Sequence, residues 1–157
     1  MKKLFLLISF LTLSIFTANA QEIANNAIGI RFGNNSGFGA EINYQNKLSN
    51  SNRIELGLGV RGNSEYSGFK ASALYQWVWQ LQDRFNWYAG AGGGLGSWNV
   101  KKTNTSSTGI FVSGVVGIEY SFDIPLLISL DFKPEIGFNG FYDGLNSDLG
   151  LGIRYQF

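Results

Sequence analysis

The chain has 157 residues, no cysteine, no histidine, 21 glycines and an aromatic content of 15%. Its charged content is also 15%, against about 25% in an average soluble domain. Without cysteine there is no disulfide, thiol nucleophile or cysteine zinc site, and without histidine the commonest general base and metal ligand is missing. The length suits one domain. The composition therefore argues against most catalytic chemistries, and we expect no enzymatic activity, cofactor or metal site.

Residues 1–20 have the pattern of a secretory signal peptide. Lys2 and Lys3 precede an apolar stretch over residues 4–16, and Ala18 and Ala20 form a cleavage site of the A-x-A type. The apolar stretch is too short for a membrane-spanning helix, which needs about 20 residues. We predict cleavage after Ala20 and a single barrel domain over residues 21–157, with a retained anchor as the alternative.

The predicted mature chain is close to neutral. Two of the 12 basic residues lie in the predicted signal peptide, which leaves 10 basic against 11 acidic residues and a net charge of −1. This balance provides no basic surplus that would attract nucleic acid.

Eight segments of the predicted mature chain alternate between apolar and polar residues with a period of two, which is typical of β-strands. Clusters of Gly, Asn, Ser and Asp between these segments are typical of turns. No run of residues approaches the length of a helical membrane span. The predicted strands cover residues 28–33, 38–45, 54–61, 70–81, 85–98, 112–122, 126–133 and 148–157.

Eight alternating strands fit two barrel architectures. A soluble lipocalin-type barrel turns its apolar face inward, whereas a membrane barrel turns that face outward into lipid. The polar face favours the membrane barrel, because it consists of Gly and Ser with a few charges, and a soluble exterior is about 25–35% charged. Each charge on this face would cost up to about 2–4 kcal/mol if it pointed into the middle of a bilayer. These charged residues are Arg31, Glu41, Glu55, Arg61, Lys70, Glu119, Asp131, Lys133, Glu135, Asp148 and Arg154.

Aromatic residues collect at the strand ends. If the strands alternate up and down, these rings fall at one rim, where a lipid–water interface favours amphipathic side chains. The predicted membrane-interface aromatics are Tyr44, Trp77, Trp79, Trp87, Tyr120, Phe122, Tyr155 and Phe157. The predicted fold class is therefore an all-β, eight-stranded antiparallel up-and-down transmembrane β-barrel.

Residues 150–157 read GLGIRYQF. They resemble the C-terminal signature of bacterial outer-membrane barrels, in which a glycine and alternating hydrophobic residues precede a terminal aromatic residue. The resemblance implies that Gly152, Tyr155 and Phe157 form a signal for the barrel assembly machinery. With its signal peptide and eight strands, the whole predicted mature chain resembles the small outer-membrane barrels of the OmpA/OmpX type, and its Asn-rich connections resemble members from the Bacteroidota.

This resemblance also implies a location and a topology. The protein is expected in the outer membrane of a Gram-negative bacterium, as a monomer among lipids and lipopolysaccharide, with both termini in the periplasm. Tight periplasmic turns and longer external loops are expected, the turns at residues 82–84 and 123–125 and the loops at residues 63–68, 101–108 and 140–147. Two connections fit less well, because residues 46–52 are long for a turn and residues 34–37 are short for an external loop.

The predicted interior holds five basic and six acidic residues. An eight-stranded barrel is just wide enough for side chains to fill it, and buried charges must pair. A tight first hairpin places Arg31 opposite Glu41, and Asp131 and Arg154 fall within reach of each other in the last hairpin. We predict a salt-bridged plug. A narrow ion path is the alternative, because the glycine runs in the third, fifth and eighth strands leave space for water.

Three further features have weaker interpretations. Pro134 interrupts the seventh predicted strand, which indicates a bulge or a position near the rim. Lys101 and Lys102 suit contacts with lipopolysaccharide phosphates, although a solvated loop is the simpler interpretation. Residues 143–148 space oxygen ligands in the manner of a calcium loop but lack the terminal Glu, so that no metal site is predicted.

Some small outer-membrane barrels are enzymes that deacylate or palmitoylate lipid A, and those families use a His with a Ser and an acidic residue. This chain has no His, which leaves only Ser72 beside Lys70 or Ser129 near Lys133 as a nucleophile with a base. We therefore predict a structural or interaction role in the cell envelope. A low-conductance, porin-like pore is the first alternative, and a lipid-modifying enzyme is the second.

Overall fold

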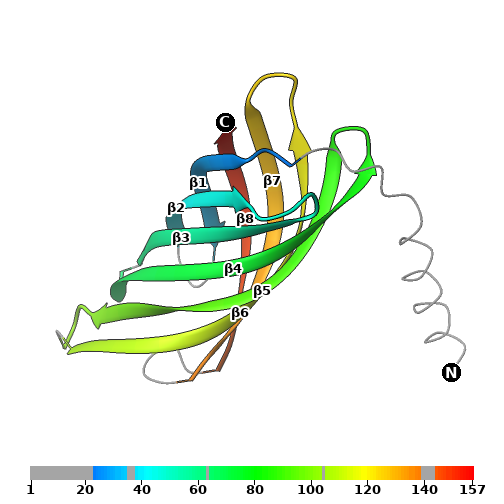
Figure 1. Ribbon diagram of the computed structural model, residues 1–157. Coiled ribbons are helices and arrows are strands. Elements are labelled where there is room, and N and C mark those ends of the chain that lie inside the picture. The colour runs from blue at the N-terminus through cyan, green and yellow to red at the C-terminus, as the bar shows by residue number, and fades with distance from the viewer. Residues whose placement is uncertain (1–22, 35–37, 63, 104, 139–143) are drawn as a thin grey trace, which may run out of the picture.

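The computed structural model (Figure 1) describes residues 23–157 except for residues 35–37, 63, 104 and 139–143. The predicted signal peptide over residues 1–20 lies outside the described residues. So do most of the connection at residues 34–37 and Asp143, the first residue of the weak calcium-loop pattern at residues 143–148.

The described chain forms a closed barrel of eight antiparallel strands, each paired with the next and the last with the first. The predicted fold class is confirmed. No helix in the described ranges is long and apolar enough to cross a membrane. The strands are β1 (Asn26–Asn34), β2 (Phe38–Lys47), β3 (Asn52–Gly62), β4 (Tyr66–Gln82), β5 (Phe85–Val100), β6 (Thr105–Ser121), β7 (Leu126–Gly137) and β8 (Gly144–Gln156).

The barrel has two distinct ends. We call the end that contains Asn26 and Gln156 the terminal end; it also holds the connections at residues 48–51, 83–84 and 122–125. We call the opposite end, where the remaining connections lie, the loop end. In Figure 1 the hairpin of β5 and β6 extends beyond its neighbours at the loop end. Strands β4, β5 and β6 have 17, 16 and 17 residues, and the other five have 9 to 13.

The strands are longer than predicted at several ends. Part of each predicted external loop belongs to a strand, because β4 begins at Tyr66, β6 at Thr105 and β8 at Gly144. The predicted long turn at residues 46–52 also shortens to residues 48–51. The pairing of Val100 with Thr105 shows the reason. Serine and threonine residues continue the backbone ladder beyond the apolar part of the sheet, where the sequence pattern no longer indicates a strand.

The two faces of the sheet are sorted by polarity. Leu56, Ile118 and Leu151 point outward and are 45, 46 and 45% exposed, whereas Glu55 and Glu119 point inward and are 2 and 3% exposed. In the described strands, every charged side chain lies on the inward-facing set of positions. This arrangement is the reverse of a soluble lipocalin-type barrel, whose interior is apolar.

Of the two outcomes predicted for Pro134, the bulge is absent; the residue lies near the loop end, where β7 ends at Gly137. The β6–β7 register is the same before and after Pro134, since Ser113 pairs with Glu135 and Val116 with Phe132. Only the two pairs between them are missing from the ladder, because proline has no N–H to donate. The strand therefore continues, and Glu135 is buried inside the barrel.

Candidate functional site

Twelve charged side chains in the lumen pair with one another in four groups, which together we call the lumen network. Six are basic and six are acidic, so their formal charges cancel. Each of the twelve makes at least one ion pair with another member. The network consists of Arg31, Arg53, Arg61, Lys70, Lys133, Arg154, Glu41, Glu55, Glu119, Asp131, Glu135 and Asp148.

Arg31 is the centre of the network toward the loop end. Its Nε donates to Asp131 at 2.9 Å and its Nη1 donates to Asp148 at 2.7 Å. Arg61 also pairs with Asp148, and the Tyr88 hydroxyl donates to Asp131 at 3.0 Å. Arg31 thus joins β1 to two strands on the other side of the closing seam, β7 and β8.

Glu55 is the centre of the middle layer. It accepts from Lys133 Nζ at 2.9 Å, from Arg154 Nη2 at 3.1 Å and from the Gln45 amide at 2.7 Å. Lys133 also reaches Glu41, at 3.3 Å. Because charge-assisted hydrogen bonds run between strands that are not neighbours, this layer cross-braces the barrel.

Arg53 and Glu119 form a bidentate pair toward the terminal end, with distances of 3.1 and 2.7 Å. Arg53 also donates to Gln76 at 2.7 Å and lies 4.9 Å from the centroid of the Tyr88 ring. Sequence reasoning missed Arg53 because the third strand was expected to begin at residue 54. The available signal was its position two residues before Glu55, on the same face of the strand. With Arg53 included, the lumen network has six basic and six acidic residues.

Two pairs of residues that were predicted to lie close together in the lumen do not form ion pairs with each other. Arg31 is opposite Glu41 in the register, as expected, but it pairs with acidic residues on β7 and β8. Arg154 likewise pairs with Glu55 and not with Asp131. Long side chains in a narrow closed barrel reach across the interior, so backbone neighbours on one hairpin need not be charge partners.

The lumen also contains an apolar cluster. Leu74, Val78, Tyr88 and Val115 form a buried cluster on β4, β5 and β6. At the loop end, Trp98 packs against Phe111. The alternation did not identify these residues as part of the lumen, because it led us to expect polar side chains at the inward positions.

At the inward glycines, the side chain of a neighbouring residue occupies the space that a side chain on the glycine would need. A Cβ atom on Gly150 would collide with the guanidinium of Arg31. A Cβ atom on Gly117 would lie 2.6 Å from Tyr88 Cζ, and one on Gly94 would lie 2.6 Å from Phe111 Cζ. The space that the glycine runs were expected to offer to water is thus filled by protein atoms at these positions.

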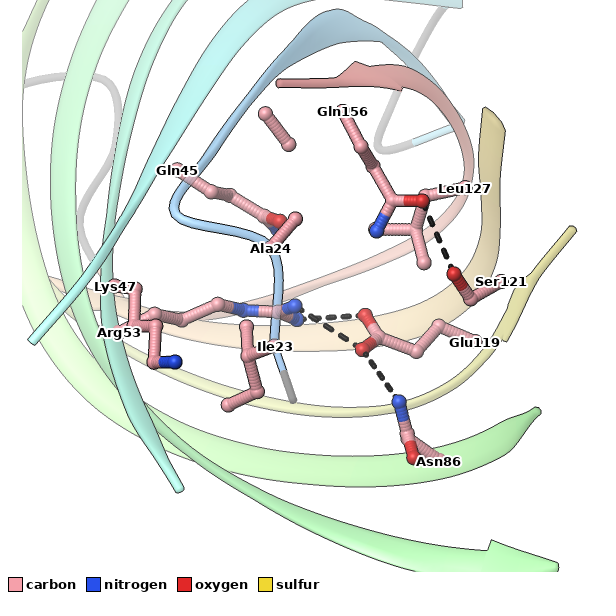
Figure 2. Close-up of a pocket in the computed structure, with 11 residues that line it drawn as sticks. Ile23, Ala24, Gln45, Lys47, Arg53, Asn86, Glu119, Ser121, Leu127 and Gln156 are labelled. Carbon is pink, nitrogen blue, oxygen red and sulfur yellow. Dashed lines mark hydrogen bonds and ion pairs between the residues drawn. The ribbon is translucent and has the colours of Figure 1, made fainter. Parts of the chain in front are cut away.

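The opening of the lumen at the terminal end, which we call the terminal mouth, is also occupied. Figure 2 shows Ile23 and Ala24 inside the mouth, close to the paired side chains of Arg53 and Glu119. Ile23 packs against the apolar cluster. The remaining cavity is about 20 Å³, which is room for about one water molecule.

The predicted interface aromatics lie toward the terminal end of the barrel. Several of them contact one another: the rings of Trp79 and Trp87 stack with centroids 4.3 Å apart, and Tyr120 meets Phe122 edge-on at 4.7 Å. The others point outward near the same rim: Tyr44, whose hydroxyl donates to Asn26 at 2.6 Å, Trp77, Tyr155 and Phe157.

The predicted assembly-signal residues differ in their surroundings. Tyr155 and Phe157 are exposed on the outer face. Gly152 faces the lumen, where a Cβ atom would lie 2.5 Å from Ser129 Oγ and 2.7 Å from Arg154 Nη1. Glycine at this position therefore accommodates the lumen network in the folded barrel.

The candidate bases are engaged in ion pairs. Lys70 pairs with Glu135, Lys133 pairs with Glu41 and Glu55, and Ser129 accepts from Arg154 at 2.7 Å. An ammonium held by a carboxylate is a poor general base. At the loop end, Asp148 of the weak calcium pattern is likewise engaged, by Arg31 and Arg61.

Comparisons with known proteins agree on the architecture. No protein-family model matches the sequence, and no curated protein does. Among solved structures, the N-terminal β-barrel domain of Pseudomonas aeruginosa OprF has 14% identity and a TM-score of 0.71, over 85% of this chain and 98% of that one. Neisserial surface protein A has 16% identity and a TM-score of 0.66, over 84% and 94%. The outer membrane enzyme PagL has 11% identity and a TM-score of 0.57, over 83% and 99%. The chain thus has the fold of small outer-membrane barrels.

Proposed function

We propose that this protein is an outer-membrane barrel with a closed, salt-bridged lumen that has a structural or interaction role in the cell envelope. The observation that carries the proposal is the sorting of charge. Twelve paired charges face the axis, and the described strands present none outward. A lipid environment favours this arrangement, because a basic side chain in the middle of the lipid face costs about 2–4 kcal/mol.

The outer surface supports a defined position in the bilayer. Aromatic rings such as Trp79 and Trp87 mark the rim at the terminal end, where interfacial anchoring is expected. Toward the loop end, outward residues of the β5–β6 hairpin change from Leu95 and Ile110 to Ser97 and Thr108. We place the bilayer between these two levels, with the terminal end in the periplasm, lipids and lipopolysaccharide as the surroundings, and a monomer as the working unit.

The loop end offers a surface for interaction. The β5–β6 hairpin carries exposed serine and threonine residues, and its turn carries exposed Lys101 and Lys102. These side chains suit phosphate and hydroxyl groups of lipopolysaccharide. The projecting hairpin is consequently the part of the barrel that we expect to make contacts outside the bilayer.

A closed lumen distinguishes this proposal from the alternative of a narrow pore. The purified protein is reconstituted in planar bilayers, with a known porin as a positive control for insertion and detection. We expect no stepwise current above the bare-membrane background, because the lumen charges are paired and the glycine positions are filled. Regular current steps in the wild-type protein would refute the closed lumen and establish the pore.

We also propose that the protein is not a lipid-modifying enzyme, although PagL shows that this fold can carry catalysis. The chain contains no histidine, and both lumen lysines near the candidate serines pair with carboxylates. Mass spectra of lipid A from cells with and without the gene test this point. Identical acyl-chain patterns are expected, and a gained or lost acyl chain would overturn it.

A further inference from the structure

The segment before β1 enters the terminal mouth of the lumen (Figure 2). We propose that residues 23 and 24 form a stopper, tethered at residues 25 and 26, which seals this mouth and swings out of it without unfolding the barrel. This inference rests on the proposed closed lumen and adds a movable part to it. The stopper is built from three features: an anchored hinge, a crossing of the mouth and an apolar contact on the far side.

The hinge is fixed at the rim by backbone and side-chain hydrogen bonds. The Asn25 carbonyl accepts from the Lys47 N–H at 2.9 Å, and the Asn26 N–H donates to the Phe157 carbonyl at 3.0 Å. The Asn26 side chain accepts from the Tyr44 hydroxyl at 2.6 Å. Residues 25 and 26 are therefore bound to β2 and to Phe157 by contacts that do not involve the residues before them.

The two residues immediately before this hinge in the sequence project across the mouth. Ile23 packs against the cluster of Leu74, Val78, Tyr88 and Val115, which belongs to β4, β5 and β6. In a closed ring of eight strands, β5 is the strand farthest from β1. The three steps from Asn26 to Ile23 span at most about 10 Å, so the segment projects inward across the opening, as Figure 2 shows.

The stopper covers the Arg53–Glu119 pair, which is the pair of the lumen network that lines the cavity at the terminal mouth. Arg53 and Glu119 are 1 and 3% exposed, and Ile23 lines the same small cavity with both of them. By excluding water, the stopper strengthens the attraction within this pair. A polar lumen layer is thus sealed by one apolar side chain.

The seal is weaker than the barrel around it. Neither Ile23 nor Ala24 belongs to a strand, and in the described part of the chain the backbone hydrogen bonds of this segment begin at Asn25. Segments held by few contacts open at lower free energy than the core ladders of the same protein. The mouth therefore opens by release of Ile23 while β1 stays paired.

Thiol labelling measures this opening directly, because the chain has no cysteine of its own. Leu127 lines the terminal-mouth cavity and is 2% exposed, so Leu127→Cys places one reporter behind the stopper. The full-length protein is purified from membranes, and its reaction with a water-soluble maleimide is timed in detergent and in lipid vesicles. Ile23→Ala and Ile23→Glu are each combined with the reporter. Ile28→Ala, an equal truncation on the outward face of β1, is the matched control.

We expect slow labelling of the reporter in the wild-type background and after Ile28→Ala. Labelling should accelerate about tenfold or more after Ile23→Ala, and further after Ile23→Glu, because the apolar contact is lost. The heat-dependent gel mobility of each variant confirms that the barrel is folded, and Ile23→Ala keeps the test valid if the charged variant fails to fold. Equal labelling rates with and without Ile23 would overturn the stopper.

Bilayer recordings on the same variants separate this inference from the closed lumen. Wild-type current steps would refute the closed lumen, whatever the labelling rates are. A silent wild-type barrel with unchanged labelling in the Ile23 variants would leave the closed lumen intact and refute the stopper alone. A silent wild-type barrel with accelerated labelling supports both.

Discussion

Removing one partner of the Arg53–Glu119 pair should destabilise the barrel more than removing both. Glu119 accepts two hydrogen bonds from Arg53, at 3.1 and 2.7 Å, and one longer bond from Asn86 at 3.4 Å. Arg53→Met leaves a buried carboxylate without its charge partner, which costs about 3–5 kcal/mol of unfolding free energy. Glu119→Leu leaves the guanidinium unpaired at a similar cost.

The double variant removes the buried charges together. What remains is the loss of hydrogen bonds to the amides of Gln76 and Asn86, about 1–3 kcal/mol. The double-mutant cycle should therefore give a coupling of at least about 3 kcal/mol. The exposed pair of Arg84 and Asp123, with side chains 37 and 86% exposed, is the matched control and should give less than about 1 kcal/mol.

Denaturant unfolding in detergent micelles, followed by tryptophan fluorescence, measures all four terms of each cycle. The chain has 4 tryptophans, so unfolding has a strong signal. If the double variant is destabilised by the full sum of the two single variants, the pair is not coupled, and the reasoning about the lumen network is wrong.

Two smaller substitutions test other parts of the lumen by the same unfolding assay. Tyr88→Phe removes the hydroxyl that donates to Asp131 at 3.0 Å and should cost about 1–3 kcal/mol; no change would mean that this bond does not brace the network. Gly150→Ala places a Cβ atom against the Arg31 guanidinium and should cost about 1–3 kcal/mol. Gly114→Ala, whose Cβ atom would lie 3.4 Å from the nearest protein atom, is its control and should be nearly neutral.

The sequence predicted the fold and the two faces well, for a physical reason. In a membrane barrel each strand must hide its charges from lipid, so the period-two pattern is unusually strict. Leu56 and Glu55 follow it, one outward and the other inward. Strand ends were predicted less well, because the pattern disappears where the β5–β6 ladder leaves the apolar zone and serine and threonine occupy both faces.

Side-chain partners inside the lumen were the least predictable feature. Pairing between neighbouring strands is local and follows from register, as the position of Arg31 opposite Glu41 shows. The partners that Arg31 takes, Asp131 and Asp148, come from strands near the other end of the chain. Their proximity depends on barrel closure and on the glycine at position 150 that makes room for the guanidinium. No short-range pattern encodes that combination.

Buried ion pairs are weak evidence for stability, since a well-packed apolar core is often as stable. The lumen network has a different physical consequence, which is the specification of register. A slip of one residue in one strand turns all its inward side chains outward. For β7 this would expose Asp131, Lys133 and Glu135 to lipid, at up to about 2–4 kcal/mol for a basic residue and less for an acidic one. An apolar lumen would carry no such penalty, so the charges select one closed arrangement among the many that eight alternating strands permit.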